Sequence, residues 1–218
     1  MDFINRLLGY MPALLEGAMF TVLLTIISVF FGAILGLFLA LGRLAKNQIL
    51  DRICWFYIWL FRGTPLLMQL FFIYYALPMI YPPLTMAKFP AALVALSLNS
   101  AAYLAEIIRA AIQSIDKGQM EAAKALGMSY GQAMKRIVIP QSYRRLIPPV
   151  GNELIALLKD SSLVAMIAMT ELMKVTNQIS TRESNAVIYI PAAVIYLCLT
   201  TLFTYIFDKL EKKYSIYE

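Results

Sequence analysis

Four long apolar runs without a charged residue constrain this chain more than any other feature of its sequence. They cover residues 17–42, 63–87, 89–105 and 184–207. A helix needs about 20 mainly apolar residues to cross the hydrocarbon core of a membrane. Soluble domains carry about 25% charged residues, whereas this chain is 15% charged and 61% apolar. The runs therefore predict an all-α membrane protein.

A fifth apolar stretch lies between the last two runs and is interrupted by charge. Residues 146–158 contain Glu153, and residues 161–170 follow after Lys159 and Asp160. We count this stretch as one more crossing. The sequence thus predicts five transmembrane helices in a single domain over residues 1–218.

The Lys and Arg residues are distributed unevenly over the two faces that five crossings define. Thirteen of the nineteen fall on the face that holds the C-terminus, and four, including Arg6, fall on the other. Arg62 and Lys159 are set aside as boundary or intramembrane residues. Positive residues accumulate on the cytoplasmic side of membrane proteins. The uneven distribution therefore predicts a cytoplasmic C-terminus and an outside N-terminus. It also accounts for the net charge of +6 without a nucleic acid as a partner.

The segment at residues 114–140, on the same basic face, has the pattern of two short helices. Asp116 can cap the first helix, and Gly127 can end it with left-handed backbone. Ser129 can open the second helix in a capping box, and we expect Pro140 to mark its end. An amphipathic unit of this kind suits docking of another protein, and a structured linker without a partner is the alternative.

The same segment carries a motif at fixed spacing. Glu121, Ala122 and Ala123 are followed by Gly127 and then by the run from Ile137 to Pro140. This pattern resembles the EAA loop of bacterial ABC importer permeases, which reads EAA, three residues, G, nine residues and I-x-L-P. Ile139 in place of Leu is a conservative departure. Residues 61–65, 102–109, 118–119 and 158–163 are similar to the polar amino acid permeases of this class. The positions that match the loop are Glu121, Ala122, Ala123, Gly127, Ile137 and Pro140.

The resemblance covers roughly residues 14–208 and implies the permease subunit of an ATP-driven amino acid importer with the type I fold. It implies a second permease chain, identical or related, two ATP-binding subunits docked on the EAA loops, and an extracytoplasmic substrate-binding protein. The location that it implies is the bacterial cytoplasmic membrane. The chain contains no G-x-x-x-x-G-K-[ST] phosphate-binding loop, so we expect ATP and Mg²⁺ in the partner and no cofactor in this chain.

Polar residues near the expected middle of the bilayer are the candidates for substrate binding. At 1.5 Å per residue, Glu153 lies about 12 Å inside Arg145, and Asn99 lies about 16 Å below Lys88, in a core of about 30 Å. Transporter sites usually lie at this depth, and ionisable groups there are functional candidates. A carboxylate suits a cationic, arginine- or lysine-like side chain. The predicted substrate-binding residues are Glu153, Asn99, Tyr103 and Asn152.

Structural explanations of the same residues stay open at this point. Glu153 can instead form an ion pair with Lys159 or with an arginine of a neighbouring helix. For Asn99 the alternative is a hydrogen bond between helices. We expect Glu106 to pair with Arg109, three residues further along the helix.

Two other classes of function also have to be weighed. An intramembrane hydrolase fits poorly, because the chain has no G-x-S-x-G motif and no His, the commonest general base and metal ligand. We therefore predict neither catalytic residues nor a metal site. A self-sufficient secondary transporter or channel is disfavoured only by the EAA pattern.

Overall fold

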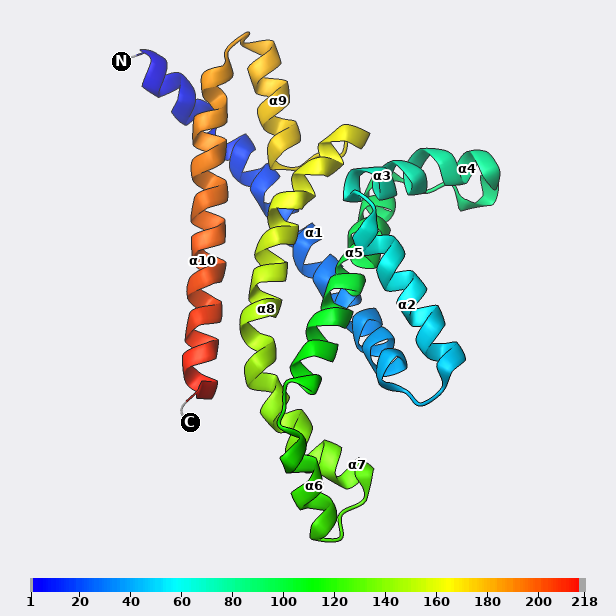
Figure 1. Cartoon of the computed structure of the whole chain (residues 1–218). Helices are drawn as coiled ribbons and strands as arrows, with labels where there is room; N and C mark the ends of the chain where they lie inside the picture. Colours follow the sequence, from blue (N-terminus) through cyan, green and yellow to red (C-terminus); the bar gives the residue numbers. More distant parts are fainter. Residues whose placement is uncertain (1, 216–218) are drawn as a thin grey trace.

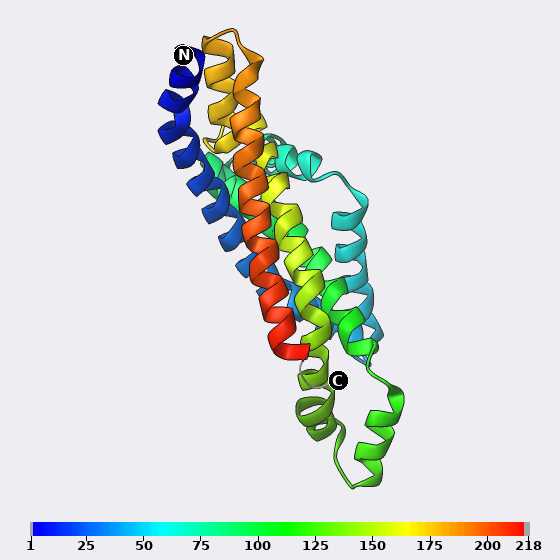
Figure 2. The same ribbon diagram turned by 90° about the vertical axis from the view of Figure 1, so that its left-hand side faces the viewer.

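A computed structural model describes the backbone of residues 2–215 and the side chains of residues 9–214, and every regular element in this part is helical. The longest helices are α1 (Asp2–Leu44), α5 (Lys88–Gln113), α8 (Ile139–Asp160) and α10 (Tyr189–Ser215). They run along the long axis of the molecule, with the start of α1 and the end of α10 at opposite ends (Figures 1 and 2). The predicted all-α class is confirmed.

Three helices of the described part have the length and apolar character of a membrane crossing: Gly9–Leu44, Lys88–Gln113 and Ala186–Tyr214. A fourth candidate joins α2 (Gln48–Gly63) to the segment Leu66–Ile80, with a bend of 105° between them. Helix α8 does not meet the same standard, because it carries five charged residues. The number of five crossings therefore stays a prediction.

The apolar run at 63–87, predicted as one clean crossing, is a continuous helical stretch only from Leu66 to Ile80, and this stretch meets α2 at a bend of 105°. Gly63 ends α2, and Pro65 precedes α3 (Leu66–Phe71), which continues through the π-helical turn η1 (Phe72–Ala76) into α4 (Leu77–Ile80). Proline has no amide hydrogen, so the ladder of α2 cannot pass through it. The 3₁₀ turn η2 (Pro82–Leu84) leads into α5. Figure 1 shows α3 and α4 turned aside from α2.

Helices α1 and α5 approach each other closely where α1 has two glycines one turn apart. A Cβ atom on Gly32 would lie 3.0 Å from the Ser100 Cβ, and one on Gly36 would lie 2.9 Å from the Ala101 carbonyl oxygen. Small residues at this spacing let helix backbones pack tightly in membranes. The two glycines therefore serve packing.

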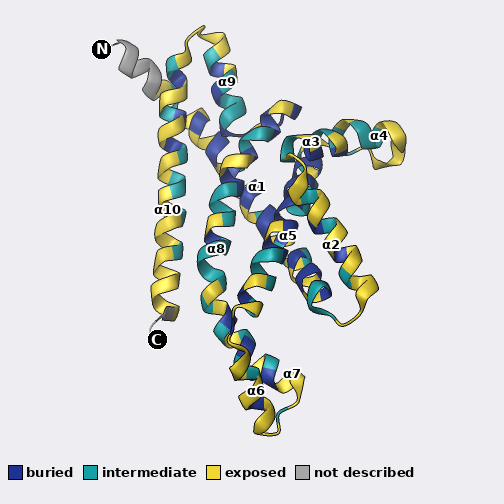
Figure 3. Cartoon of the chain, in the orientation of Figure 1, coloured by how far each residue is buried: buried dark blue, intermediate teal, exposed yellow. Residues whose placement is uncertain are grey.

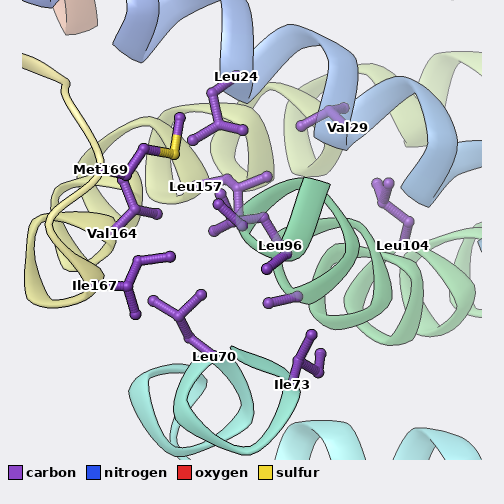
Figure 4. Packing of buried hydrophobic residues seen from close by; sticks show 13 residues of the cluster. Leu24, Val29, Leu70, Ile73, Leu96, Leu104, Leu157, Val164, Ile167 and Met169 are labelled. Carbon is purple, nitrogen blue, oxygen red and sulfur yellow. The ribbon is translucent and has the colours of Figure 1, made fainter. Parts of the chain in front are cut away.

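The main core lies where α1, α3, α5 and α8 meet the 3₁₀ helix η4 (Ser161–Ile167). Figure 4 shows Leu24 of α1, Leu70 of α3, Leu96 of α5 and Leu157 of α8 directed toward this common centre. Large apolar residues outside the core are exposed along α10, among them Leu197, Leu202 and Ile206, and Figure 3 shows most of this helix in the colour of exposed residues. Exposed apolar surface of this extent suits contact with lipid or with another chain.

The two ends of the molecule are built differently. At one end, α9 (Leu172–Arg182) packs against α1 and is followed by the turn η5 (Ala186–Ile188). At the other end, α6 (Lys117–Ala125) and α7 (Tyr130–Ala133) project beyond the end of α10 (Figures 1 and 2). A π-helical turn, η3 (Met134–Val138), joins α7 to α8.

Candidate functional site

A cavity of about 420 Å³ lies between the start of α3, the middle of α5 and the second half of α8. Three of the four predicted substrate-binding residues, Asn99, Tyr103 and Glu153, line it together. Asn152 is exposed and does not line the cavity, because a helix turns each neighbour about 100° away. We call this space the acidic cavity, since the described residues that line it include Glu153 and Asp160 and no Lys or Arg.

The two carboxylates reach one cavity because of their spacing on α8. Residues seven apart on an α-helix differ by only about 20° around the axis, so Glu153 and Asp160 share a face. Among the described residues, neither carboxylate forms a salt bridge. An ion pair of Glu153 with Lys159 or a neighbouring arginine is thus not formed. Asp160 was missed as a site residue, although its spacing from Glu153 could have indicated it.

Asn99 also forms a hydrogen bond between helices, which was the alternative to a role in substrate binding. Its side-chain nitrogen donates to the Gln69 side-chain oxygen at 3.0 Å and to the Phe61 carbonyl at 3.3 Å. The Gln69 amide in turn donates to Phe61 O at 2.8 Å, Thr64 O at 3.1 Å and Thr64 Oγ1 at 2.9 Å. These bonds satisfy carbonyls left free where α2 stops. The hydrogen bond between helices is confirmed, and Gln69 was missed.

The bend that these amides hold forms one wall of the acidic cavity. Thr64, Pro65, Leu66 and Leu67 all line it. Gln69 and Asn99 are both buried, so their hydrogen bonds are shielded from water. We call residues 61–67 the elbow. The position of this wall therefore depends on two side-chain amides, one from α3 and one from α5.

An ion cluster lies on α5 next to the cavity. Glu106 accepts two hydrogen bonds from Arg109, at 3.0 and 2.7 Å, which confirms the predicted pair. Arg62 of α2 lies 3.8 Å from Glu106, and its guanidinium carbon lies 5.3 Å from the centroid of the Tyr103 ring. Arg62 was set aside in the sequence as a boundary residue, and the structure brings it to the site.

The segment at 114–140 has the two predicted helices with the predicted caps. Asp116 accepts a hydrogen bond from the Gly118 amide at 2.6 Å and opens α6. Gly127 has φ +78°, and its amide and that of Met128 bond back to carbonyls of α6. This left-handed conformation suits glycine and ends the helix. Ser129 and Gln132 form the predicted capping box of α7.

Pro140 does not end the second helix, and that prediction was wrong. It lies in the first turn of α8, directly after η3, so α7, η3 and α8 follow one another without a break from Tyr130 to Asp160. A π-helical turn shifts the hydrogen-bonding pattern by one residue. Pro140 also lies in the first turn of α8, where the missing amide hydrogen of proline costs little. The helical stretch can therefore continue through this residue.

The matched EAA positions divide into inner and outer faces of the segment. Ala123 is buried, whereas Glu121 and Ala122 are exposed. Leu126 at the tip and Tyr130 are the large side chains that project here, and 79% of Leu126 is exposed. Neither was singled out in the sequence.

Comparison with known proteins identifies the family. Residues 32–216 match the family described as the inner membrane component of binding-protein-dependent transport systems. The chain belongs to this family. The permease resembles the arginine transport system permease protein ArtQ of Bacillus subtilis (strain 168), with 41% identity over 98% of this chain and 97% of that protein. The glutamine transport system permease protein GlnP of Escherichia coli (strain K12) is 36% identical over 94% of both chains.

Solved structures agree in fold. One chain in a crystal structure of an amino acid ABC transporter with histidines is 36% identical, with a TM-score of 0.91 over 98% of the permease and 99% of that chain. A chain of the inward-facing methionine transporter MetNI gives a TM-score of 0.82 at 23% identity, over 94% of the permease and 98% of that chain, which shows the shared fold.

These findings confirm the expected class. The permease is a multi-pass membrane subunit of an amino acid ABC transporter and is not an enzyme. The alternatives of an intramembrane hydrolase and a self-sufficient transporter lose their basis, since the matched proteins are ABC permeases.

Proposed function

We propose that the permease moves amino acids with a basic side chain through the acidic cavity. The observation that carries this proposal is the pair of carboxylates, Glu153 and Asp160, in a cavity that none of the described Lys and Arg residues lines. Its volume of about 420 Å³ falls in the range of small-molecule sites, about 300–1,000 Å³. In this arrangement Glu153 binds the cationic side chain, and Asn99 and Tyr103 contribute polar contacts.

The charge of the cavity indicates the substrate class, whereas overall sequence identity to the relatives does not. ArtQ is named for arginine, whereas GlnP is named for glutamine, and the two are 41% and 36% identical to the permease. Identity of this degree therefore spans more than one substrate. Asn152, predicted with the others, is exposed on the neighbouring face of α8 and receives no role in the cavity.

We further propose that residues 114–140 couple the permease to a separate ATPase. Support comes from a projecting unit with fixed helix ends at Gly127 and Ser129 and an exposed surface around Leu126. The contact would involve Glu121, Ala122, Ala123, Gly127, Ile137 and Pro140. ATP and Mg²⁺ would bind to two such ATPase subunits, and this chain would hold no cofactor.

The remaining assembly follows from the same proposal. A second permease chain, the same or a relative, would complete the membrane part, and an extracytoplasmic binding protein would deliver the amino acid. The basic face of the sequence and the projecting segment would lie in the cytoplasm of a bacterial cell, with the N-terminus outside. Arg6, one of the four basic residues assigned to the outer face, lies outside the described side chains.

The substrate proposal is tested by Glu153→Gln in the complete transporter, reconstituted into proteoliposomes with its ATPase and binding protein. Loss of one half of a buried charge pair costs about 2–5 kcal/mol. We therefore expect arginine and lysine uptake to fall steeply and glutamine uptake to change less. Glu211→Gln on the exposed end of α10 is the matched control.

Two results would contradict the proposal in different ways. Undiminished arginine uptake by the Glu153→Gln transporter would remove Glu153 from recognition. Failure of the variant to assemble, with normal assembly of Glu211→Gln, would assign the carboxylate to the structure of the helix bundle.

A further inference from the structure

The acidic cavity has a neighbour in the direction of the coupling segment. A second cavity of about 550 Å³ extends past Glu106 and Ala110 to Ser114 and Arg145, where α5 ends. We call it the inner cavity. Of the described residues, only Tyr103 lines both cavities. Its side chain therefore stands at the boundary between them.

The Tyr103 ring is held from one side by a cation. The Arg62 guanidinium carbon lies 5.3 Å from the ring centroid, within the range of a cation–π contact. Arg62 is itself oriented by Glu106 at 3.8 Å, which Arg109 holds through two hydrogen bonds. The Tyr103 hydroxyl has no hydrogen-bond partner among the described residues. Arg62 is thus the main polar contact that fixes the ring.

The same arginine places a positive charge beyond the ring. Arg62 lines the inner cavity and not the acidic cavity. A cationic side chain bound by Glu153 and Asp160 would meet this like charge on moving past Tyr103, and like charges repel each other. Ring and charge together obstruct the same path.

We propose that Tyr103 closes the acidic cavity toward the coupling segment and that Arg62 is the positioning residue that holds Tyr103 in place. The inference rests on the proposed function, because it takes the acidic cavity as the substrate site. Arg62 lies in the last turn of α2 and is part of the elbow that walls this cavity. Movement of α2 relative to α5 would separate Arg62 from Tyr103 and join the two cavities.

Access to a cysteine in the acidic cavity tests this closure without any need for substrate. Ala156 lines that cavity, so Ala156→Cys is introduced into a chain in which Cys54 and Cys198 are replaced by alanine. The complete transporter in inside-out vesicles without ATP is treated with a membrane-impermeant cationic thiosulfonate. Ala110→Cys in the inner cavity is the matched control, and the rate at Ala156→Cys is divided by the rate at Ala110→Cys in the same variant, because Arg62 and Tyr103 line the inner cavity as well.

Variants of Arg62 and of Tyr103 distinguish the effect of the ring from the effect of its positioning residue. We expect Arg62→Gln to raise the rate of Ala156→Cys labelling about two- to fivefold, the effect of one exposed cation–π contact. Tyr103→Ala should raise it further, whereas Tyr103→Phe and Arg62→Lys keep the contact and should label as slowly as the parent. An anionic thiosulfonate must label the variants in the same order of rates. If Arg62→Gln acted only by removing a positive charge, it would lower the labelling rate of the anionic reagent.

Equal labelling of Ala156→Cys in the parent, Arg62→Gln and Tyr103→Ala, with normal labelling of Ala110→Cys, would overturn the inference. If Tyr103→Ala does not assemble, the labelling rates of Ala156→Cys in Tyr103→Leu and in Arg62→Gln decide the question in the same way. Arginine uptake by the parent is measured separately. A transporter that shows the labelling pattern but carries no basic amino acid would refute the proposed substrate and leave the closure intact.

Discussion

Gln69 holds the elbow between α2 and α3 through more hydrogen bonds than any neighbouring side chain, so its loss should be measurable. The substitution Gln69→Met keeps the unbranched shape of the side chain and removes the amide. Three donated bonds, to Phe61 O, Thr64 O and Thr64 Oγ1, disappear together. Asn99 also loses its acceptor on Gln69 and keeps its longer bond to Phe61 O.

The expected cost follows from what remains unpaired. The Thr64 carbonyl loses the bond from Gln69, and a buried acceptor without a partner costs about 1–3 kcal/mol. Hydrogen bonds between helices in membrane proteins average only about 0.6 kcal/mol, with a maximum of about 1.7 kcal/mol. Thr64 lines the acidic cavity, where water can replace part of the loss. We therefore expect the free energy of unfolding to fall by about 1–2 kcal/mol.

Unfolding of the full-length permease in mixed micelles with increasing SDS measures this cost. The two tryptophans of the chain, Trp55 and Trp59, both lie on α2, so their fluorescence reports on the helix that the elbow ends. Gln178→Met, at an exposed position of α9, is the control and should leave the transition unchanged. A Gln69→Met transition identical to that of the parent would refute the assignment of the elbow to this amide.

Two further predictions concern the coupling segment and the orientation of the chain. Gly127→Val places a β-branched residue at φ +78°, which costs about 1–2 kcal/mol; the protein should insert normally but co-purify with less ATPase, and full transport would exclude a coupling role. In a chain without Cys54 and Cys198, a cysteine at Lys88 should be labelled from outside the cell and one at Lys117 only from inside; the reverse pattern would invert the orientation.

Local signals in the sequence were sufficient for the parts of the fold that local chemistry determines. The caps at Asp116 and Ser129 and the left-handed end at Gly127 involve residues only two to five positions apart, and the structure has each of them. Bilayer-length apolar runs likewise indicated α1, α5 and α10. The Glu106–Arg109 pair was predictable because both residues lie on one turn of one helix.

Features that depend on contacts between distant segments could not be derived in the same way. The run at 63–87 is apolar throughout, so its composition does not reveal that Gln69 and Asn99 hold a bend of 105° at its start. Depth along a helix indicated Glu153, but the choice of Asp160 over Asn152 depends on which face of α8 meets α3 and α5. Arg62 required the position of α2 against α5.

The helix that continues through Pro140 connects the two proposed sites. Because Pro140 does not stop the helix, the coupling segment and the acidic cavity belong to one helical stretch that runs from Tyr130 to Asp160. Rigid secondary elements can carry coupling between distant sites. The two variants then have separable effects: Gly127→Val should reduce ATPase docking for every amino acid, whereas Glu153→Gln should alter the preference among amino acids while docking stays normal. Equal effects of both variants on docking would mean that the cavity and the coupling segment are a single structural unit.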